Sequence, residues 1–256
     1  MPGRDWSTKC NPSGRVIPRP SASPLLVLFD VDGTILDGGG LIADSMIGAF
    51  RAAGETPPTR SDVMRLIGLS LREMIDILTR GLDPDRRDKI QAGYRTRYFD
   101  TIVRQIDPPV FPGTEAMLFD LYRAGITLGI TTGKSIRSVG HLLDSMDWHR
   151  MFASVQCAEL NPSKPSPEMV LKAMEEAGHG PRTTVLVGDS RYDMQMAARA
   201  GIPAVGVSWG YNAPEELRAE GAAAIAETVG DLTEGFLRRV VAEAERVPAG
   251  LTPDER

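Results

Sequence analysis

An α/β fold with a parallel sheet is the fold class that the sequence predicts, and three observations support it. Short apolar runs, such as Leu25–Phe29 and residues 184–187, are typical of strands buried on both faces. From about residue 111 onward such runs alternate with segments of helical periodicity, which implies parallel strands joined by right-handed crossovers. Residues 38 to about 107 carry helical patterns and no convincing strand, so we expect a helical insertion after the first strand.

The insertion is expected to hold four helices. Ser70 and Glu73 form a capping-box pattern at the start of the third helix. Asp83 and Pro84 pair a favoured N-cap with proline at the first position of the fourth. The expected helices cover residues 41–53, 61–67, 70 to about 81 and 84 to about 107, and apolar side chains recur at four-residue steps along the last one: Ile90, Tyr94, Tyr98, Ile102 and Ile106.

The rest of the chain is expected to complete the sheet. Strands are predicted at residues 126–130, 153–156, 184–187 and 203–207, with helices between them and an amphipathic helix from about Val229 to Glu245. The predicted division is therefore an α/β core of residues 24–37 and 108–246, a helical cap of residues 38–107, and two ends. Residues 1–23, rich in Pro, Ser, Gly and Arg, are expected to form a disordered tail, and residues 247–256 a frayed end.

Composition excludes several classes of protein. The 256 residues carry a net charge of −5 and no basic run, so neither nucleic acid nor an anionic membrane is an expected partner. No apolar stretch approaches the roughly 20 residues that a membrane span needs. Two cysteines cannot form a disulfide framework and fit a reducing compartment, so we expect a cytoplasmic protein. The sequence does not indicate an oligomeric state.

Two carboxylates follow the first strand directly. Asp30 and Asp32 lie two residues apart, so strand periodicity places them on one side of the chain, and Gly33 allows a sharp turn after them. Two acids this close are costly unless a cation or a shared proton offsets their repulsion. We therefore expect a metal site with a carboxylate nucleophile at the carboxyl end of this strand, where open α/β sheets bind ligands.

Polar groups also follow three later strands. Thr131, Thr132 and Lys134 end the second strand, Lys164 follows the third, and Asp189 ends the fourth, with Asp193 four residues further on. The ends of parallel strands share one edge of the sheet, so these groups are expected to form one pocket. Carboxylate ligands suit Mg²⁺, which binds through few carboxylates together with water and substrate phosphate. A lysine and a threonine hydroxyl would hold the remaining phosphate oxygens.

These four motifs, in this order, resemble those of the haloacid dehalogenase-like hydrolases, in particular the phosphoglycolate-phosphatase-like branch. The resemblance covers roughly residues 25–232 and rests on Asp30-Val31-Asp32-Gly33-Thr34, Thr132-Gly133-Lys134, Lys164-Pro165 and Gly188-Asp189-Ser190 through Asp193. It implies a three-layer Rossmann-like sheet core with the helical cap inserted after the first strand. It also implies a Mg²⁺-dependent phosphatase that acts on a small phosphorylated metabolite, such as phosphoglycolate or a sugar phosphate.

The resemblance implies a role for each motif residue. Asp30 would attack phosphorus and form an aspartyl-phosphate, and Asp32 would first protonate the leaving oxygen and then activate water. Mg²⁺ would be held by Asp30, the backbone carbonyl of Asp32 and Asp189, while Asp193 would bind it directly or steady its water shell. Thr132 and Lys164 would hold the transferring phosphoryl group.

Several of these residues also have a competing candidate or a purely structural interpretation. Thr131 competes with Thr132, and Lys134 competes with Lys164, although Lys134 is more simply a surface lysine at a helix start. Asp193 could be a first-turn helix charge only. The cap break at residues 68–70 could face substrate or be an ordinary helix connection. For His141, His149 and His179 the sequence favours structural positions.

Three other activities share part of this motif pattern. A dehalogenase is disfavoured because carbon–halogen cleavage needs neither a metal nor a protonated leaving oxygen, and the dehalogenases of the family lack the second aspartate that Asp32 supplies here. A sugar phosphomutase would use the same motifs and differ in the cap. A receiver-like phospho-aspartate signalling module has no cap and no general acid two residues after its acceptor, so the motif order argues against it.

Overall fold

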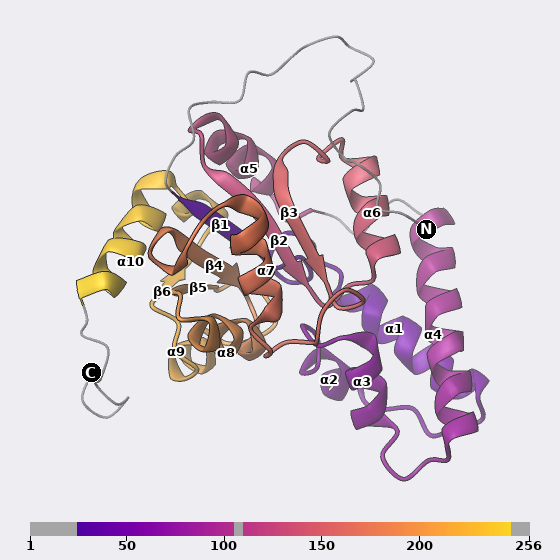
Figure 1. Cartoon of the computed structure of the whole chain (residues 1–256). Coiled ribbons are helices and arrows are strands. Elements are labelled where there is room, and N and C mark those ends of the chain that lie inside the picture. Colours follow the sequence, from indigo (N-terminus) through magenta and orange to yellow (C-terminus); the bar gives the residue numbers. More distant parts are fainter. Residues whose placement is uncertain (1–24, 105–109, 247–256) are drawn as a thin grey trace.

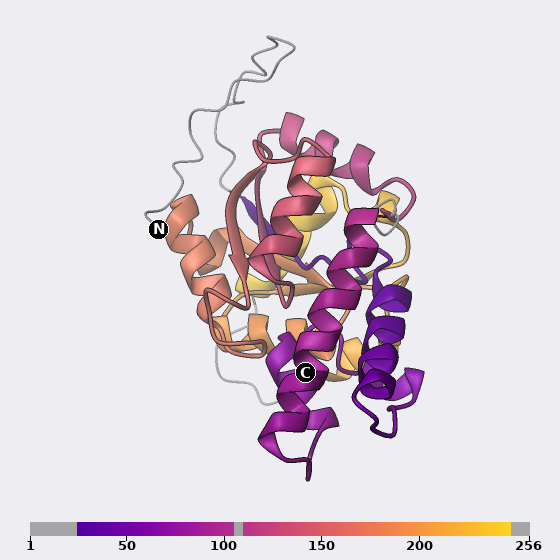
Figure 2. The same cartoon turned by 90° about the vertical axis from the view of Figure 1, so that its right-hand side faces the viewer.

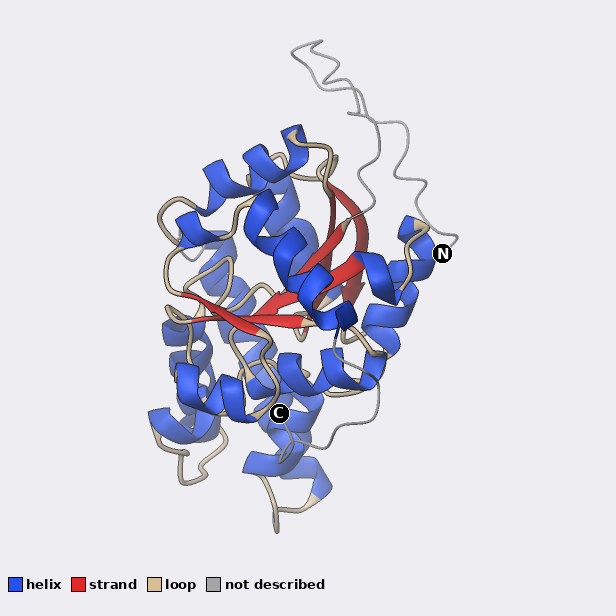
Figure 3. Ribbon diagram, turned by 90° about the vertical axis from the view of Figure 1, so that its left-hand side faces the viewer, coloured by secondary structure: helices blue, strands red, loops and turns tan. Residues whose placement is uncertain are grey.

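The computed structural model describes residues 25–104 and 110–246, and it confirms the α/β fold class. Six strands form one parallel sheet in the order β3-β2-β1-β4-β5-β6 (Figures 1 and 3). The strands are β1 (Leu26–Phe29), β2 (Thr127–Thr132), β3 (Phe152–Cys157), β4 (Thr184–Gly188), β5 (Ala204–Val207) and β6 (Ala224–Ala226). The first strand therefore lies in the middle of the sheet, between β2 and β4.

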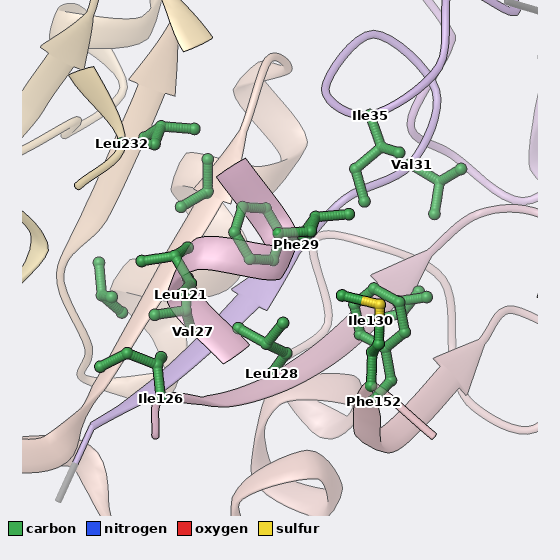
Figure 4. Packing of buried hydrophobic residues seen from close by; sticks show 14 of the residues in the cluster. Val27, Phe29, Val31, Ile35, Leu121, Ile126, Leu128, Ile130, Phe152 and Leu232 are labelled. Atoms are coloured by element: carbon green, nitrogen blue, oxygen red, sulfur yellow. The ribbon is translucent and has the colours of Figure 1, made fainter. Parts of the chain in front are cut away.

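Alternation along β1 explains why both faces of the sheet are covered. Val27 and Phe29 point to one face, where they join the larger apolar cluster (Figure 4). Leu26 and Leu28 point to the other face and join a second cluster. The first face is covered by α5 (Thr114–Arg123), α6 (Ile136–Ser145) and α10 (Glu234–Arg246), and the second by α7 (Glu168–Ala177), α8 (Arg191–Ala200) and α9 (Pro214–Ala219). The core thus has three layers.

Five described helices lie between β1 and β2, and the first four of them form the cap. These four are α1 (Gly39–Ala52), α2 (Arg60–Met64), α3 (Leu71–Leu78) and α4 (Pro84–Arg104). Figure 2 shows α4 alongside α1, and their buried residues, including Met46, Phe50, Ile90 and Tyr94, form an apolar cluster separate from the two at the sheet. Asp83 accepts a hydrogen bond from the Arg86 backbone N–H at 3.0 Å, as its N-cap pattern predicts.

Some sequence expectations differ from the structure. The last helix begins at Glu234 because Val229–Asp231 forms a single 3-10 turn. Helix α9 and strand β6 were not predicted, since each is short and β6 is an edge strand paired only with β5. Ile106, the end of the cap and both predicted terminal segments lie outside the described residues, so the domain boundaries stay predictions. Among the helices of residues 25–104 and 110–246, none is long and apolar enough to cross a membrane.

Candidate active site

The carboxyl ends of β1, β2 and β4 bring the predicted site residues to one edge of the sheet. Pairing of β1 with β4 extends to Asp30, whose backbone N–H donates to the Val187 carbonyl at 2.9 Å. Asp30 is therefore positioned by the sheet itself. The loop after β3 brings Lys164 to the same place, where its Nζ lies 2.8 Å from Asp30 Oδ1.

Asp30, Asp189 and Asp193 form a buried carboxylate cluster. One oxygen from each carboxylate lies within 4.8 Å of the others, and all three residues are almost fully shielded from solvent. Within residues 25–104 and 110–246, Lys164 is the cation that contacts this cluster, because its Nζ also lies 2.6 Å from Asp193 Oδ1. With all groups ionised, three carboxylates face one ammonium group, so two negative charges stay unbalanced. A divalent cation bound by carboxylate oxygens would balance them, and the donor set fits such an ion.

The pKa values express the same imbalance. Burial raises the pKa of Asp30 to about 7, and the charge on Asp193 adds to the effect while Lys164 opposes it. Burial also raises the pKa of Asp189 well above its usual value, reinforced by Asp30 and Asp193. In contrast, Asp193 and Asp30 raise the pKa of Lys164 above its ordinary value despite its burial. Asp30 and Asp189 would therefore gain from the positive charge of a bound cation.

Asp189 is held in place by two donors from different segments. Thr34 Oγ1 donates to Oδ1 at 3.2 Å, and the Tyr211 backbone N–H donates to Oδ2 at 2.9 Å. The close approach depends on Gly33, whose φ of +92° makes the turn and whose missing side chain leaves room for the Asp189 carboxylate. The sequence identified Thr34 only as part of a motif, and it did not indicate that Tyr211 contacts the site.

Asp193 is a first-turn residue of α8 and also lies in the carboxylate cluster. It is the third residue of α8, where it forms a reciprocal capping box with Ser190. Its other carboxylate oxygen contacts Lys164 within the carboxylate cluster. Because α8 begins directly after β4, the helix start places this carboxylate at the sheet edge.

Asp32 does not join the carboxylate cluster but pairs with Lys134. Both oxygens of Asp32 lie 2.8 Å from Lys134 Nζ, which also donates to the Tyr98 hydroxyl at 2.6 Å. Lys134 is buried, so its interpretation as a surface lysine is wrong. Asp32 and Tyr98 raise the pKa of Lys134 above its usual value, although burial opposes this. Its position directly after Thr132-Gly133 was the sequence signal that could have marked it.

The two threonines at the end of β2 are separated by the sheet. Thr132 lines the cavity above the carboxylates, and its Oγ1 accepts a hydrogen bond from the Lys134 backbone N–H at 3.2 Å. Thr131 is buried, does not line that cavity, and its Oγ1 has no hydrogen-bond partner among the described residues. The geometry thus favours Thr132 as the site residue, in agreement with the sequence pattern.

A cavity of about 770 Å³ lies between the cap and the sheet edge. Its floor contains Asp30, Asp32 and Thr132, and the cap break at residues 68–70 forms part of its wall. Three arginines also line it, Arg72 and Arg95 from the cap and Arg137 from α6. Its volume is in the range of small-molecule sites.

The cap break contacts the core directly. The Ser70 backbone N–H donates to Ser163 Oγ at 2.8 Å, which replaces the second half of the expected capping box. Ser70 Oγ still accepts from the Glu73 backbone N–H, so only the helix-start half of that pattern is present. The backbone at Gly68 and Leu69 also packs against Gly133, where a side chain would come 2.8 Å from the Gly68 carbonyl oxygen. The cap is therefore seated on the loops that follow β2 and β3.

The three histidines lie outside this cavity. His141 contacts the Ile102 carbonyl, His149 contacts Asp144, and His179 contacts Thr127 and Thr183. These contacts agree with the structural positions that the sequence favoured.

Comparison with known proteins shows which family the chain is similar to. The sequence profile of the haloacid dehalogenase-like hydrolases matches residues 27–207. A probable phosphatase named IndB from Dickeya dadantii is 32% identical over 81% of this chain and 91% of its own. A phosphoglycolate phosphatase from Pseudomonas putida is 30% identical over 84% of this chain and 81% of its own. A solved structure from Bacteroides fragilis, described as a haloacid dehalogenase-like hydrolase, superposes with a TM-score of 0.74 at 27% identity, covering 82% of this chain and 100% of the other.

The fold and these matches identify the class of protein. The chain belongs to the haloacid dehalogenase-like hydrolase family. Within that family its relatives place it in the phosphoglycolate-phosphatase-like branch, which confirms the resemblance seen in the sequence.

Proposed function

We propose that this protein is a Mg²⁺-dependent phosphatase that hydrolyses a small phosphomonoester through an aspartyl-phosphate on Asp30. The observation that carries the proposal is the setting of Asp30 on the floor of the cavity. Its Oδ1 faces Lys164, while no hydrogen-bond donor among the described residues is directed at Oδ2. A carboxylate oxygen without a donor, in a cavity that admits a small molecule, is suited to nucleophilic attack.

The reaction would proceed in two steps, transfer of the phosphoryl group to Asp30 and hydrolysis of the intermediate. In the first, an Asp30 oxygen bonds to phosphorus while the bond to the leaving oxygen breaks, and the proton carried by Asp32 passes to that oxygen. In the second, water attacks phosphorus, Asp32 takes its proton, and the bond to Asp30 breaks to release inorganic phosphate. Thr132 and Lys164 would hold the phosphoryl oxygens, on which the negative charge is spread in the transition state.

Mg²⁺ would be held by Asp30, Asp189 and the backbone carbonyl of Asp32, with Asp193 as a direct ligand or a partner of its water shell. Support comes from the three clustered carboxylates and their unbalanced charge. When bound, the ion would offset the repulsion between the anionic nucleophile and the anionic substrate.

The proposed substrate is a small phosphorylated metabolite, either phosphoglycolate-like or a sugar phosphate. The Pseudomonas putida relative, named a phosphoglycolate phosphatase, supports the first, and the cavity volume accommodates either. A cytoplasmic location remains our prediction from the use of cysteine.

The decisive experiment is a phosphate-release screen over a metabolite panel with wild type and Asp30→Asn in parallel. We expect release from one or a few monoesters with Mg²⁺, and loss of release in EDTA or in Asp30→Asn. Circular dichroism checks that the variant is folded. Activity that persists in chelator would remove the metal from the proposal, and turnover near the wild-type rate in folded Asp30→Asn would reject the nucleophile.

The same screen tests the other activities. Isomerised sugar phosphate with little free phosphate, dependent on a sugar bisphosphate, would indicate a mutase instead. Phosphate retained on Asp30 without turnover would indicate a signalling module.

A further inference from the structure

Lys134 is a buried lysine outside the predicted set of catalytic residues. Its side chain is 6% exposed, and Nζ lies within hydrogen-bond distance of three acceptors. Two of these are the oxygens of Asp32 at 2.8 Å each, and the third is the Tyr98 hydroxyl at 2.6 Å. An ammonium group has three donors, so this arrangement uses all of them.

This arrangement determines where Asp32 can point. An ammonium group shielded from water is costly unless it stays paired, so Lys134 and Asp32 are held together rather than free to rotate. Gly38 packs against Asp32 Oδ1 on another side, where even a methyl group would not fit. Each carboxylate oxygen has two lone-pair sites, so Lys134 leaves room for the proton that Asp32 is proposed to carry.

Tyr98 connects this pair to the cap. It belongs to α4, whereas Lys134 follows β2 and Asp32 follows β1. Its ring stacks on Tyr94, with centroids 5.6 Å apart, and Lys134 Nζ lies 5.2 Å from the Tyr98 ring centroid. The position of α4 is thereby linked through one side chain to the side chain that would transfer the proton.

We propose that Lys134 is a positioning residue that aims Asp32 at the leaving oxygen, and that Tyr98 makes this aim depend on the seated cap. The inference rests on the proposed function, in which Asp32 supplies the proton. Lys134 acts through Asp32 and contributes no bond to the reaction. Its loss therefore affects most the substrates whose leaving oxygen needs a proton in the transition state.

The test compares two aryl esters of similar size, p-nitrophenyl phosphate and phenyl phosphate. In the substrates neither aryl group carries a net charge that Lys134 could bind, but the phenyl ester releases the more basic oxygen and depends more on general acid catalysis. We expect Lys134→Met to lower kcat/KM for phenyl phosphate about tenfold more than for p-nitrophenyl phosphate. Tyr98→Phe should lower the ratio of kcat/KM for phenyl phosphate to kcat/KM for p-nitrophenyl phosphate in the same direction, but by less. The exposed Lys172→Met is the matched control and should leave the ratio unchanged.

A double-mutant cycle then separates positioning from a merely structural role. In an Asp32→Asn background the proton carrier is absent, so adding Lys134→Met should cause little further loss with either ester. Equal losses on both esters, or additive losses in the cycle, would overturn the positioning role. If Lys134→Met does not fold, Tyr98→Phe is measured in the same cycle and decides the question.

The outcomes also separate this inference from the proposed function. A wild-type protein that releases no phosphate from either ester, or an active Asp30→Asn variant, would reject the function and the inference together. Wild-type activity that depends on Asp30, combined with an unchanged ester ratio in Lys134→Met, would reject the inference alone.

Discussion

The ammonium group of Lys164 lies 2.8 Å from the carboxylate of Asp30, and Lys164 is fully buried. The same nitrogen contacts Asp193, so one cation bridges the proposed nucleophile and the start of α8. Within the cluster of Asp30, Asp189 and Asp193, this lysine offsets part of a charge that would otherwise oppose folding. Two different losses are therefore expected when it is removed.

Lys164→Met should reduce both activity and stability. Loss of the group that is proposed to hold phosphoryl oxygens is expected to lower kcat by about 10²–10³. Removing one partner of a buried ion pair should lower the free energy of unfolding in EDTA by about 3–5 kcal/mol, and added Mg²⁺ should restore part of it. Urea unfolding with and without Mg²⁺ measures the second effect, with exposed Lys172→Met as the control. An unfolding free energy equal to that of the control would contradict the role of Lys164 in the cluster.

The neighbouring threonines provide a matched pair of variants. Thr132→Val removes a hydroxyl that faces the cavity, so kcat should fall by about 10². Thr131→Val replaces a buried hydroxyl that lacks a hydrogen-bond partner among the described residues, so activity should persist and stability should stay equal or increase. Steady-state kinetics and thermal melts of both variants check this. A larger loss of activity in Thr131→Val would reverse the assignment.

Alanine substitutions at two glycines separate the effect of the contact between cap and core from a general effect on stability. Gly133→Ala would place a methyl group against the carbonyls of Gly68 and Leu69, so the cap must shift, and kcat/KM should fall about 10–100-fold. Gly140→Ala lies within α6 with open space around it, so it should add about 0.5–1 kcal/mol of stability and leave kinetics unchanged. Unchanged kinetics in Gly133→Ala would show that the cap contact is dispensable.

His179 should make stability depend on pH. Burial lowers the pKa of its imidazole below the ordinary value of 6.5, and a hydrogen bond that the ring donates to the Thr183 backbone opposes the shift. Between the lowered pKa of the folded state and the ordinary pKa of 6.5, the unfolded chain binds more protons than the folded chain. The free energy of unfolding therefore rises with pH through this window, and the contribution of His179 is fully present above 6.5. His179→Gln should flatten that rise in urea unfolding. An NMR titration that places the folded pKa at or above the ordinary value would refute the prediction.

The placement of Asp30 and Asp32 at the end of β1 was predictable because its determinants are local. Phe29 and the residues before it are apolar without interruption, which indicates a strand buried on both faces, and two-residue spacing puts Asp30 and Asp32 at its end. Asp83 before Pro84 is a similar local signal, and α4 begins there as predicted. The capping pattern of Ser70 was only half correct, because Ser163 from a distant loop competes for its backbone N–H.

By itself, the sequence determined the alternation of the longer strands and helices, the presence of the helical cap and the identity of the four motifs. Each depends on periodicity, turn residues or capping within about one helix length, or on residue types at fixed spacing. The sequence also placed these groups at one edge of the sheet, but only the tertiary structure decided which of them pair with one another. Lys134 is buried and paired with Asp32, which lies 102 positions away in the chain, and with Tyr98, which lies 36 away. Neither separation leaves a local pattern in the sequence. The contacts of Lys134 and Tyr211 thus follow from packing between distant segments, which no short stretch of sequence encodes.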